Sequence, residues 1–341
     1  MKSLTLILLS LLFVSTAFAQ WQKYDVGTDA SFRGLDVVSE KVVWASGTGG
    51  TVVRTIDGGK NWDVIKVPGE EKLDFRDIEA FDANTAYILS IGNGEDSRIY
   101  KTTDGGKNWK LQFKNTIEKA FFDSIAFWDR KNGMAQSDPV DGKYVFYRTT
   151  DGENWTKVDT SKMPEAKEGE AAFAASGTSI ITHGKKGIFL ISGGTDSRVF
   201  RSKDRGKTWT VSDSLIRRGK PSQGAFSIAF GSKKRGIVVG GDYAAPDEQS
   251  QIIAYTEDGG VTWQTKLKQD PFGFRSGVTF IDKKTAIIVG TNGSDITDNS
   301  GNWWKGIDGG NYNVVQSKGK GAIWAAGPKG MVAKFAGEIP K

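Results

Sequence analysis

The sequence has 341 residues, a formal net charge of +6, a single histidine and no cysteine. The absence of cysteine excludes disulfides and thiol chemistry, and His183 alone cannot provide the ligand set of a zinc site. Charges of both signs are spread along the chain without a basic run that alternates with aromatic residues, which argues against nucleic-acid binding. We expect no cofactor and no bound metal.

The first 19 residues have the pattern of a secretory signal peptide. Met1-Lys2 precedes an apolar run from Leu4 to Phe13, and the small-residue site Ala17-Phe18-Ala19 follows. The apolar run is shorter than the ~20 residues that a membrane-spanning helix needs. We therefore expect an exported protein, periplasmic or extracellular, with one mature domain over residues 20–341 and no transmembrane segment.

A short motif that joins an aspartate to a tryptophan recurs six times. Its fullest wording is Thr55-Ile56-Asp57-Gly58-Gly59-Lys60-Asn61-Trp62. The Asp/Trp pairs are Asp57/Trp62, Asp104/Trp109, Asp151/Trp155, Asp204/Trp209, Asp258/Trp263 and the degraded Asp298/Trp303. They recur every 40 to 54 residues. This period is typical of propellers in which each repeat forms one four-stranded blade.

The residues around each motif favour strands. Short β-branched and aromatic runs alternate with Gly and Asp clusters, and the mature chain shows no sustained helical periodicity. Each unit divides into an inner strand, a second strand, a third strand that ends at the Thr or Ser of the motif, and a fourth that starts at its Trp. The predicted inner strands include Phe75–Phe81, Phe121–Phe127, Ala225–Phe230 and Phe274–Phe280.

The two ends of the mature chain together complete a seventh unit. The stretch from Asn313 to Phe335 resembles the first unit, Leu35 to Thr55, but ends before any motif. The segment Trp21–Val26 reads like the residues that follow a motif, such as Trp62–Val67. We therefore predict an all-β, seven-bladed propeller whose ring is closed by the N-terminal strand, an arrangement that leaves no open edge.

The motif is identified as the Asp-box (BNR) repeat, and its best copies are Ser202–Trp209 and Thr256–Trp263. Similar repeats occur in sialidases, sortilin-type receptors, xyloglucanases and the Ycf48/Hcf136 photosystem II assembly factors. In repeat number, length and expected export, the whole mature chain most resembles the Ycf48/Hcf136-like group. That resemblance implies an assembly factor that binds partner proteins through an arginine patch. The motif is specific for the fold and a poor guide to function.

The Asp-box residues have a structural explanation. Their carboxylates accept backbone N–H groups across the turn, Gly adopts positive φ, and Trp fills the space between blades. We therefore expect the functional residues on the opposite face, where the loops that lead into the inner strands lie. Residues at equivalent positions there are Arg33, Arg76, Glu170 and Arg275. Gathered at the channel mouth, they would form a site for an anion or an acidic peptide. The alternative is that they form salt bridges between blades.

Loops between second and third strands add further candidates on the same face. The phrase Asp-Ser-Arg occurs twice and contributes Arg98 and Arg198, and a later loop carries Tyr243. These residues either border a binding surface or are solvated turn residues. Tyr243 is the strongest candidate contact, because aromatic residues are enriched among energetically important interface residues.

An enzymatic alternative remains open. Arg33, Arg76 and Arg275, with Glu170 and Tyr243, imitate the sialidase constellation, but the chain lacks the Arg-Ile-Pro segment of sialidases and has seven units where sialidases have six. A stretch of oxygen ligands for Ca²⁺ at Asp295–Ser300 is equally well explained as a degraded Asp-box. We predict a non-enzymatic, monomeric binding or assembly protein for a protein partner or acidic peptide. A glycan-binding protein or sialidase-like glycoside hydrolase is the alternative.

Overall fold

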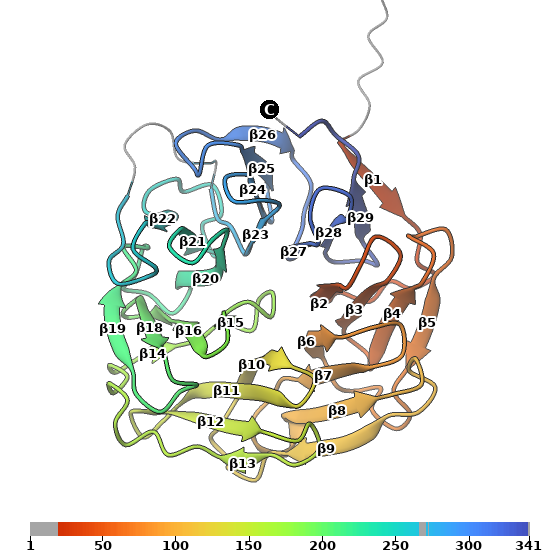
Figure 1. Cartoon of the computed structure of the whole chain (residues 1–341), viewed down its shortest axis with the longest axis horizontal. Helices are drawn as coiled ribbons and strands as arrows, with labels where there is room; N and C mark the ends of the chain where they lie inside the picture. The colour runs from red at the N-terminus through yellow and green to blue at the C-terminus, as the bar shows by residue number, and fades with distance from the viewer. Residues whose placement is uncertain (1–19, 266–270, 272, 340–341) are drawn as a thin grey trace, which may run out of the picture.

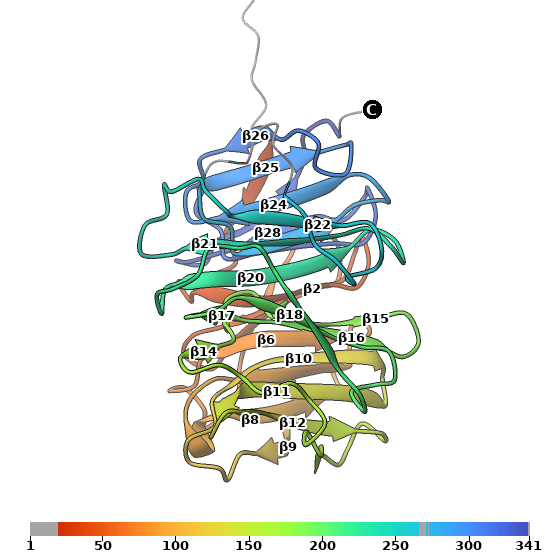
Figure 2. The same ribbon diagram turned by 90° about the vertical axis from the view of Figure 1, so that its left-hand side faces the viewer.

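The computed structural model describes residues 20–265, 271 and 273–339, so the expected signal peptide at residues 1–19 lies outside the described residues. Apart from one short 3-10 helix, η1 (Gly94–Asp96), the elements of this part of the chain are strands, grouped in seven sheets around a central axis (Figure 1). The side view in Figure 2 shows the strands running between the two faces of the ring. The predicted all-β, seven-bladed propeller is confirmed.

The first three blades follow the chain from the inside of the ring outward. Blade 1 consists of β2 (Phe32–Val37), β3 (Val43–Gly47), β4 (Thr51–Thr55) and β5 (Asp63–Lys66). Blade 2 consists of β6 (Phe75–Ala80), β7 (Ala86–Ser90), β8 (Arg98–Thr102) and β9 (Lys110–Lys114). Blade 3 consists of β10 (Phe122–Asp129), β11 (Asn132–Val140), β12 (Lys143–Thr149) and β13 (Thr156–Lys157).

Blades 4 and 5 are less regular. Blade 4 consists of β15 (Ile180–His183), β16 (Gly187–Ile191), β18 (Arg198–Ser202) and β19 (Thr210–Asp213). Blade 5 consists of β20 (Gln223–Phe230), β21 (Gly236–Asp242) and β22 (Ile253–Thr256). Two short strands, β14 (Glu170–Ala171) and β17 (Gly193–Gly194), join its inner edge. In place of the expected fourth strand of blade 5, the described residues have one bridge between Tyr255 and Gln264.

Blades 6 and 7 complete the ring. Blade 6 consists of β23 (Gly277–Phe280), β24 (Ala286–Gly290), β25 (Gly293–Thr297) and β26 (Lys305–Asp308). Blade 7 consists of β27 (Val314–Ser317), β28 (Ile323–Ala326), β29 (Val332–Phe335) and β1 (Trp21–Tyr24). β1 runs antiparallel to β29, with Trp21 opposite Phe335 and Tyr24 opposite Val332. The predicted closure of the ring by the N-terminal strand is confirmed.

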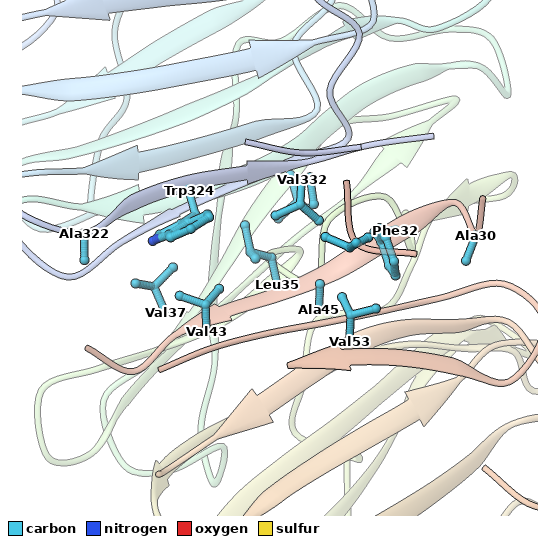
Figure 3. Close-up of a cluster of buried hydrophobic side chains, with 13 residues drawn as sticks. Ala30, Phe32, Leu35, Val37, Val43, Ala45, Val53, Ala322, Trp324 and Val332 are labelled. Atoms are coloured by element: carbon cyan, nitrogen blue, oxygen red, sulfur yellow. The ribbon is translucent and has the colours of Figure 1, made fainter. Parts of the chain in front are cut away.

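The core is divided into clusters between neighbouring blades. Figure 3 shows one of them, where Trp324 and Val332 of blade 7 face Leu35, Val43 and other residues of blade 1. Among the described residues, seven clusters of this kind fill the seven interfaces. Each cluster includes the tryptophan with which the outermost segment of a blade begins. These residues are Trp62, Trp109, Trp155, Trp209, Trp263, Trp304 and, for the interface between blades 6 and 7, Trp21.

The Asp-box turns are held by their own side chains. In the first box, Thr55 Oγ1 donates to Asp57 Oδ1 at 2.9 Å and accepts from the Gly59 N–H at 2.9 Å. Asp57 Oδ1 accepts the Asn61 N–H at 3.0 Å, and these hydrogen bonds lower the pKa of Asp57 to about 2. The same pattern holds Asp104, Asp151, Asp204 and Asp258. Each carboxylate is thus used within its own turn, on the rim opposite the start of the inner strands.

Two details of the sequence alignment were wrong. The sixth box is shifted by one residue, because Asn299 takes the place of the aspartate. Asn299 Oδ1 accepts hydrogen bonds from Thr297 Oγ1 and from the Asn302 N–H, both at 2.9 Å. The buried tryptophan is Trp304 in place of Trp303. Glu170 does not precede the inner strand of blade 4. It lies in β14, and the inner strand β15 begins at Ile180 after an inserted loop.

Among the described residues there is no helix long and apolar enough to cross a membrane.

Candidate functional site

A pocket of about 680 Å³ opens at the mouth of the central channel, on the face opposite the Asp-boxes. It lies where the inner strands begin, and every blade or the segment leading into it contributes residues, from Arg33 in blade 1 to Asn313 at the start of blade 7. Its volume is within the range of ~300–1,000 Å³ that is usual for ligand sites. We call it the mouth pocket.

The floor of the mouth pocket is the inserted loop 172–179, which we call the channel loop. Figure 1 shows the segment before β15 reaching toward the centre of the ring. The Ala172 N–H donates to Asp138 Oδ1 of blade 3 at 2.7 Å, and Thr178 Oγ1 bonds Ser227 Oγ of blade 5 at 2.6 Å. A side chain at Gly177 would collide with Asp77 Oδ1 of blade 2, at 2.2 Å from its Cβ. The loop is therefore fixed to blades on both sides of the channel.

Two arginines of the predicted group, Arg33 and Arg76, line the mouth pocket. Arg33 Nη1 donates to the Ala175 carbonyl of the channel loop at 3.1 Å, and Arg76 Nη1 donates to the Ala174 carbonyl at 3.4 Å. Arg76 also forms a salt bridge with Asp74 at 2.7 Å. We call Arg33 and Arg76 the arginine pair.

Arg33 differs from Arg76 in that no described carboxylate forms a salt bridge with it. Burial, with a smaller contribution from the like charge of Arg76, lowers the pKa of Arg33 to about 10, and the carboxylate of Asp74 acts in the opposite direction. The guanidinium is therefore still charged at neutral pH. A half-buried cation beside a second cation, with free N–H donors facing a pocket, is suited to bind a carboxylate or another anion.

The other predicted charged residues are not gathered at the mouth pocket. Arg275 is buried, and its Nε and Nη2 donate to Asp295 Oδ2 at 3.0 and 2.6 Å. Glu170 is paired with Arg198, which donates to it through both Nε and Nη2. Arg98 donates to both carboxylate oxygens of Glu70 at 2.7 Å. Arg275 and Glu170 thus form salt bridges, as in the alternative stated for them, although Arg275 and Asp295 belong to the same blade. Arg98 and Arg198 also form salt bridges, which neither interpretation of their loops predicted.

The repeated Asp-Ser-Arg phrase has a structural role in both places where it occurs. Ser97 Oγ accepts the Phe122 N–H at 3.0 Å, and Ser197 Oγ accepts the Ala225 N–H at 3.1 Å. Each serine thereby binds the backbone of the next blade's inner strand, while the adjacent arginine holds a glutamate that precedes it in the chain, Glu70 or Glu170. The Asp-Ser-Arg sequence therefore occurs twice because the same contact between neighbouring blades is formed twice.

The mouth pocket also holds two carboxyl groups, Asp123 and Asp138. Burial raises the pKa of Asp123 well above its usual value, and neighbouring Asp138 raises it further. Burial also raises the pKa of Asp138, to about 6. The charge of the pocket therefore changes in the mildly acidic range, where Arg33 stays positive.

Aromatic residues form another side of the pocket, and three of them were not predicted as site residues from the sequence. Tyr243, a predicted contact, lines the pocket and is 52% exposed. Phe173, Phe226 and Phe274 lie beside it, and the rings of Phe173 and Phe226 are stacked with centroids 3.9 Å apart. In the sequence, Phe226 and Phe274 read as ordinary inner-strand core residues. The one signal for Phe173 was the longer spacing between the third and fourth boxes, which marks the inserted loop.

A second cavity of about 220 Å³ lies on the other side of the channel loop. It is lined by Asp36, Asp77 and Glu79, and burial raises the pKa of all three carboxyl groups. Asp77 accepts the backbone N–H groups of Ile78 and Ile125 at 2.8 and 2.7 Å. Over residues 20–265, 271 and 273–339, no group of three or more His, Asp or Glu side chains is arranged to hold a metal ion.

Comparisons with known proteins agree with the fold and the repeat. Residues 14–112 match the family described as photosynthesis system II assembly factor YCF48. No curated protein sequence matches the chain. A solved structure described as YCF48 bound to D1 peptide has a TM-score of 0.67 and 13% identity, covering 94% of this chain and 98% of that chain.

Two further solved structures have similar rings. YCF48 from Cyanidioschyzon merolae has a TM-score of 0.63 and 16% identity, covering 93% of this chain and 99% of that chain. The WD40 propeller domain of Doa1 has a TM-score of 0.60 and 12% identity, covering 94% and 98%. At such identities the structures show the fold alone. The Asp-box repeats and the closed seven-bladed ring show that the chain is an Asp-box (BNR) β-propeller, and its residues 14–112 are similar to the YCF48 family.

Proposed function

We propose that the chain is an exported, non-enzymatic binding or assembly protein that recognises an acidic segment of a protein partner in the mouth pocket. The observation that carries this proposal is Arg33, a charged, half-buried guanidinium beside Arg76 that has no described carboxylate partner. A buried cation is stable when it is paired, so an unpaired one at a pocket points to an anionic ligand. The fold similarity to a YCF48 structure with a bound D1 peptide supports a peptide as the ligand.

The arrangement of the remaining charged residues favours binding over sialidase-like catalysis. A sialidase-like constellation needs three arginines around one carboxylate, and Arg275 and Glu170 are each buried in a salt bridge away from the pocket. The two arginines that remain can hold a carboxylate, and the pocket is wide enough for a peptide segment.

The test is affinity capture from the native cell envelope and the culture medium. The wild-type chain is compared with an Arg33→Gln/Arg76→Gln variant and with a Lys233→Gln/Lys234→Gln variant, which removes the same charge from the opposite rim. Thermal melting checks the folding of all three. We expect a protein that the wild type and the rim variant retain and that the arginine variant loses by tenfold or more. Equal retention by all three folded proteins would contradict the proposal.

Anion binding at the mouth pocket should strengthen as the pH falls from 8 to 5. Asp138 has a pKa of about 6, so it is negatively charged at pH 8 and largely neutral at pH 5, whereas Arg33 with its pKa of about 10 stays positive throughout. Losing one nearby negative charge should improve the affinity for hexaglutamate roughly three- to tenfold. Fluorescence anisotropy at several pH values measures this change. An Asp138→Asn variant should bind hexaglutamate tightly at both pH 8 and pH 5. If the affinity of the wild type decreases as the pH is lowered, the role assigned to Asp138 is contradicted.

A further inference from the structure

The aromatic residues at the mouth pocket form a cluster that belongs to no interface between blades. Phe226 and Phe274 are buried with rings 4.8 Å apart, and Phe173 and Ala175 of the channel loop pack against them. The ring of Tyr243 stands edge-on to Phe173 and Phe226, at 6.4 and 6.1 Å. We call Phe173, Phe226, Tyr243 and Phe274 the aromatic ledge. Its exposed end at Tyr243 is apolar surface that the fold itself leaves uncovered.

The pocket therefore has two chemically different sides. Its cations, Arg33, Arg76 and Lys119, come from blades 1 to 3, whereas Phe226, Tyr243 and Phe274 come from blades 5 and 6. In the ring of Figure 1, blades 1 to 3 and blades 5 and 6 lie on opposite sides of the channel. An ion alone would use the first side only.

The channel loop fixes the distance between the two sides. Phe173 stacks on Phe226, while the carbonyl groups of the next two residues, Ala174 and Ala175, accept from Arg76 and Arg33. The ledge and the arginine pair therefore contact the loop at points that are one or two residues apart, and consecutive Cα atoms lie about 3.8 Å apart. Neighbouring residues of an extended peptide have the same spacing.

We propose that the mouth pocket recognises a two-residue signature, an acidic residue next to a residue with a large apolar side chain. The carboxylate binds the arginine pair, and the neighbouring side chain lies against the aromatic ledge at Tyr243. This inference rests on the proposed function, to which it adds the apolar half of the recognition. Aromatic and aliphatic side chains gain from burial against such rings, beyond what the charge contributes.

The test uses three hexapeptides that are acetylated and amidated at their ends: Gly-Ser-Glu-Phe-Ser-Gly, Gly-Ser-Glu-Ser-Ser-Gly and Gly-Ser-Gln-Phe-Ser-Gly. Isothermal titration calorimetry measures their affinities for the wild type, Arg33→Gln, Tyr243→Ala and Ile56→Ala. Ile56 matches Tyr243 in being 52% exposed, but it lies in an Asp-box on the opposite face. Both side chains are about half exposed, so neither substitution removes a fully buried side chain.

We expect the Glu-Phe peptide to bind on the order of tenfold more tightly than either of the others. Tyr243→Ala should remove most of its advantage over the Glu-Ser peptide, Ile56→Ala should not, and Arg33→Gln should weaken both Glu peptides alike. Equal binding of Glu-Phe and Glu-Ser, or an advantage that survives Tyr243→Ala, would overturn the two-residue signature. Equal binding of Glu-Phe and Gln-Phe would instead contradict the proposed function, so the two failures are distinguishable.

Discussion

An Arg275→Ala variant should lose about 3–5 kcal/mol of its free energy of unfolding, the cost of leaving one partner of a buried ion pair without the other. The side chains of Arg275 and Asp295 are 2% and 9% exposed, and they are joined at 2.6 Å. Arg275 also donates to the Phe274 carbonyl and to Asn292 Oδ1, at 2.9 and 2.8 Å. Urea denaturation followed by tryptophan fluorescence measures the loss.

Two controls separate the buried charge from the loss of packing. Arg130 and Asp82 form an exposed salt bridge at 2.6 Å, and Arg130→Ala should cost less than about 1 kcal/mol. In Arg275→Leu/Asp295→Leu, no charge is left unpaired, so much of the stability should return. A double variant that is as unstable as Arg275→Ala would show that the orphaned carboxylate is not the cause.

This prediction also limits how binding can be tested. A variant that replaces Arg275 together with Arg33 and Arg76 would combine loss of a ligand site with damage to blade 6, because Arg275 joins the start of β23 to β25. Arg33 and Arg76 are half-buried and hold the channel loop by single hydrogen bonds to its carbonyl groups. Substitutions restricted to these two arginines therefore change the pocket with less effect on the scaffold.

A Trp21→Ala variant should lose a similar amount, about 3–5 kcal/mol, which is the usual cost of removing a large buried aromatic side chain. Trp21 is 3% exposed, packs against Tyr312 and Phe335 with ring centroids 5.4 Å apart, and donates from Nε1 to Ser294 Oγ at 2.9 Å. It occupies the interface between blades 6 and 7. In each of the other six interfaces, the tryptophan of an Asp-box takes the corresponding place.

The matched control is Trp303→Ala, which removes a tryptophan that is 39% exposed. It should cost about 1 kcal/mol or less, because little apolar area is uncovered. Chemical denaturation of both variants makes the comparison. If both tryptophans contribute equally, the closure of the ring does not depend on the packing of Trp21.

The sequence predicted the fold well because the residues that define it are local and repeated. Each box forms its own turn, and each boxed tryptophan lies at the start of an outer segment, so the blades can be counted without knowledge of long-range contacts. The closure was predictable for the same reason, since Trp21 begins a segment that resembles those after the boxes. The sixth box was misplaced by one residue because asparagine replaces the aspartate that marked the others.

The site was less predictable because its geometry depends on contacts between distant segments. Arg275 aligns with Arg33 and Arg76, but only the structure shows Asp295 beside it. Glu170 was assigned to the wrong strand because residues 172–179 form an insertion before the inner strand β15. The aromatic ledge combines residues from four segments, and a Phe near an inner strand reads equally well as core. Arg33, Arg76 and Tyr243 were brought together at the mouth pocket, and their role in binding stays a prediction.

Blade 7 has a consequence for the order in which the molecule folds. β1 is the first strand of the ring to be synthesised, and its partner β29 is the last. Pairing over such a separation is slow, because loop closure must precede any gain from the contact. Until it occurs, the apolar residues that Trp21 covers, Tyr312 and Phe335 among them, stay open to solvent and to other chains. A ring whose seventh blade still lacks its outer strand is therefore a folding species exposed to aggregation, and the docking of Trp21 ends that exposure.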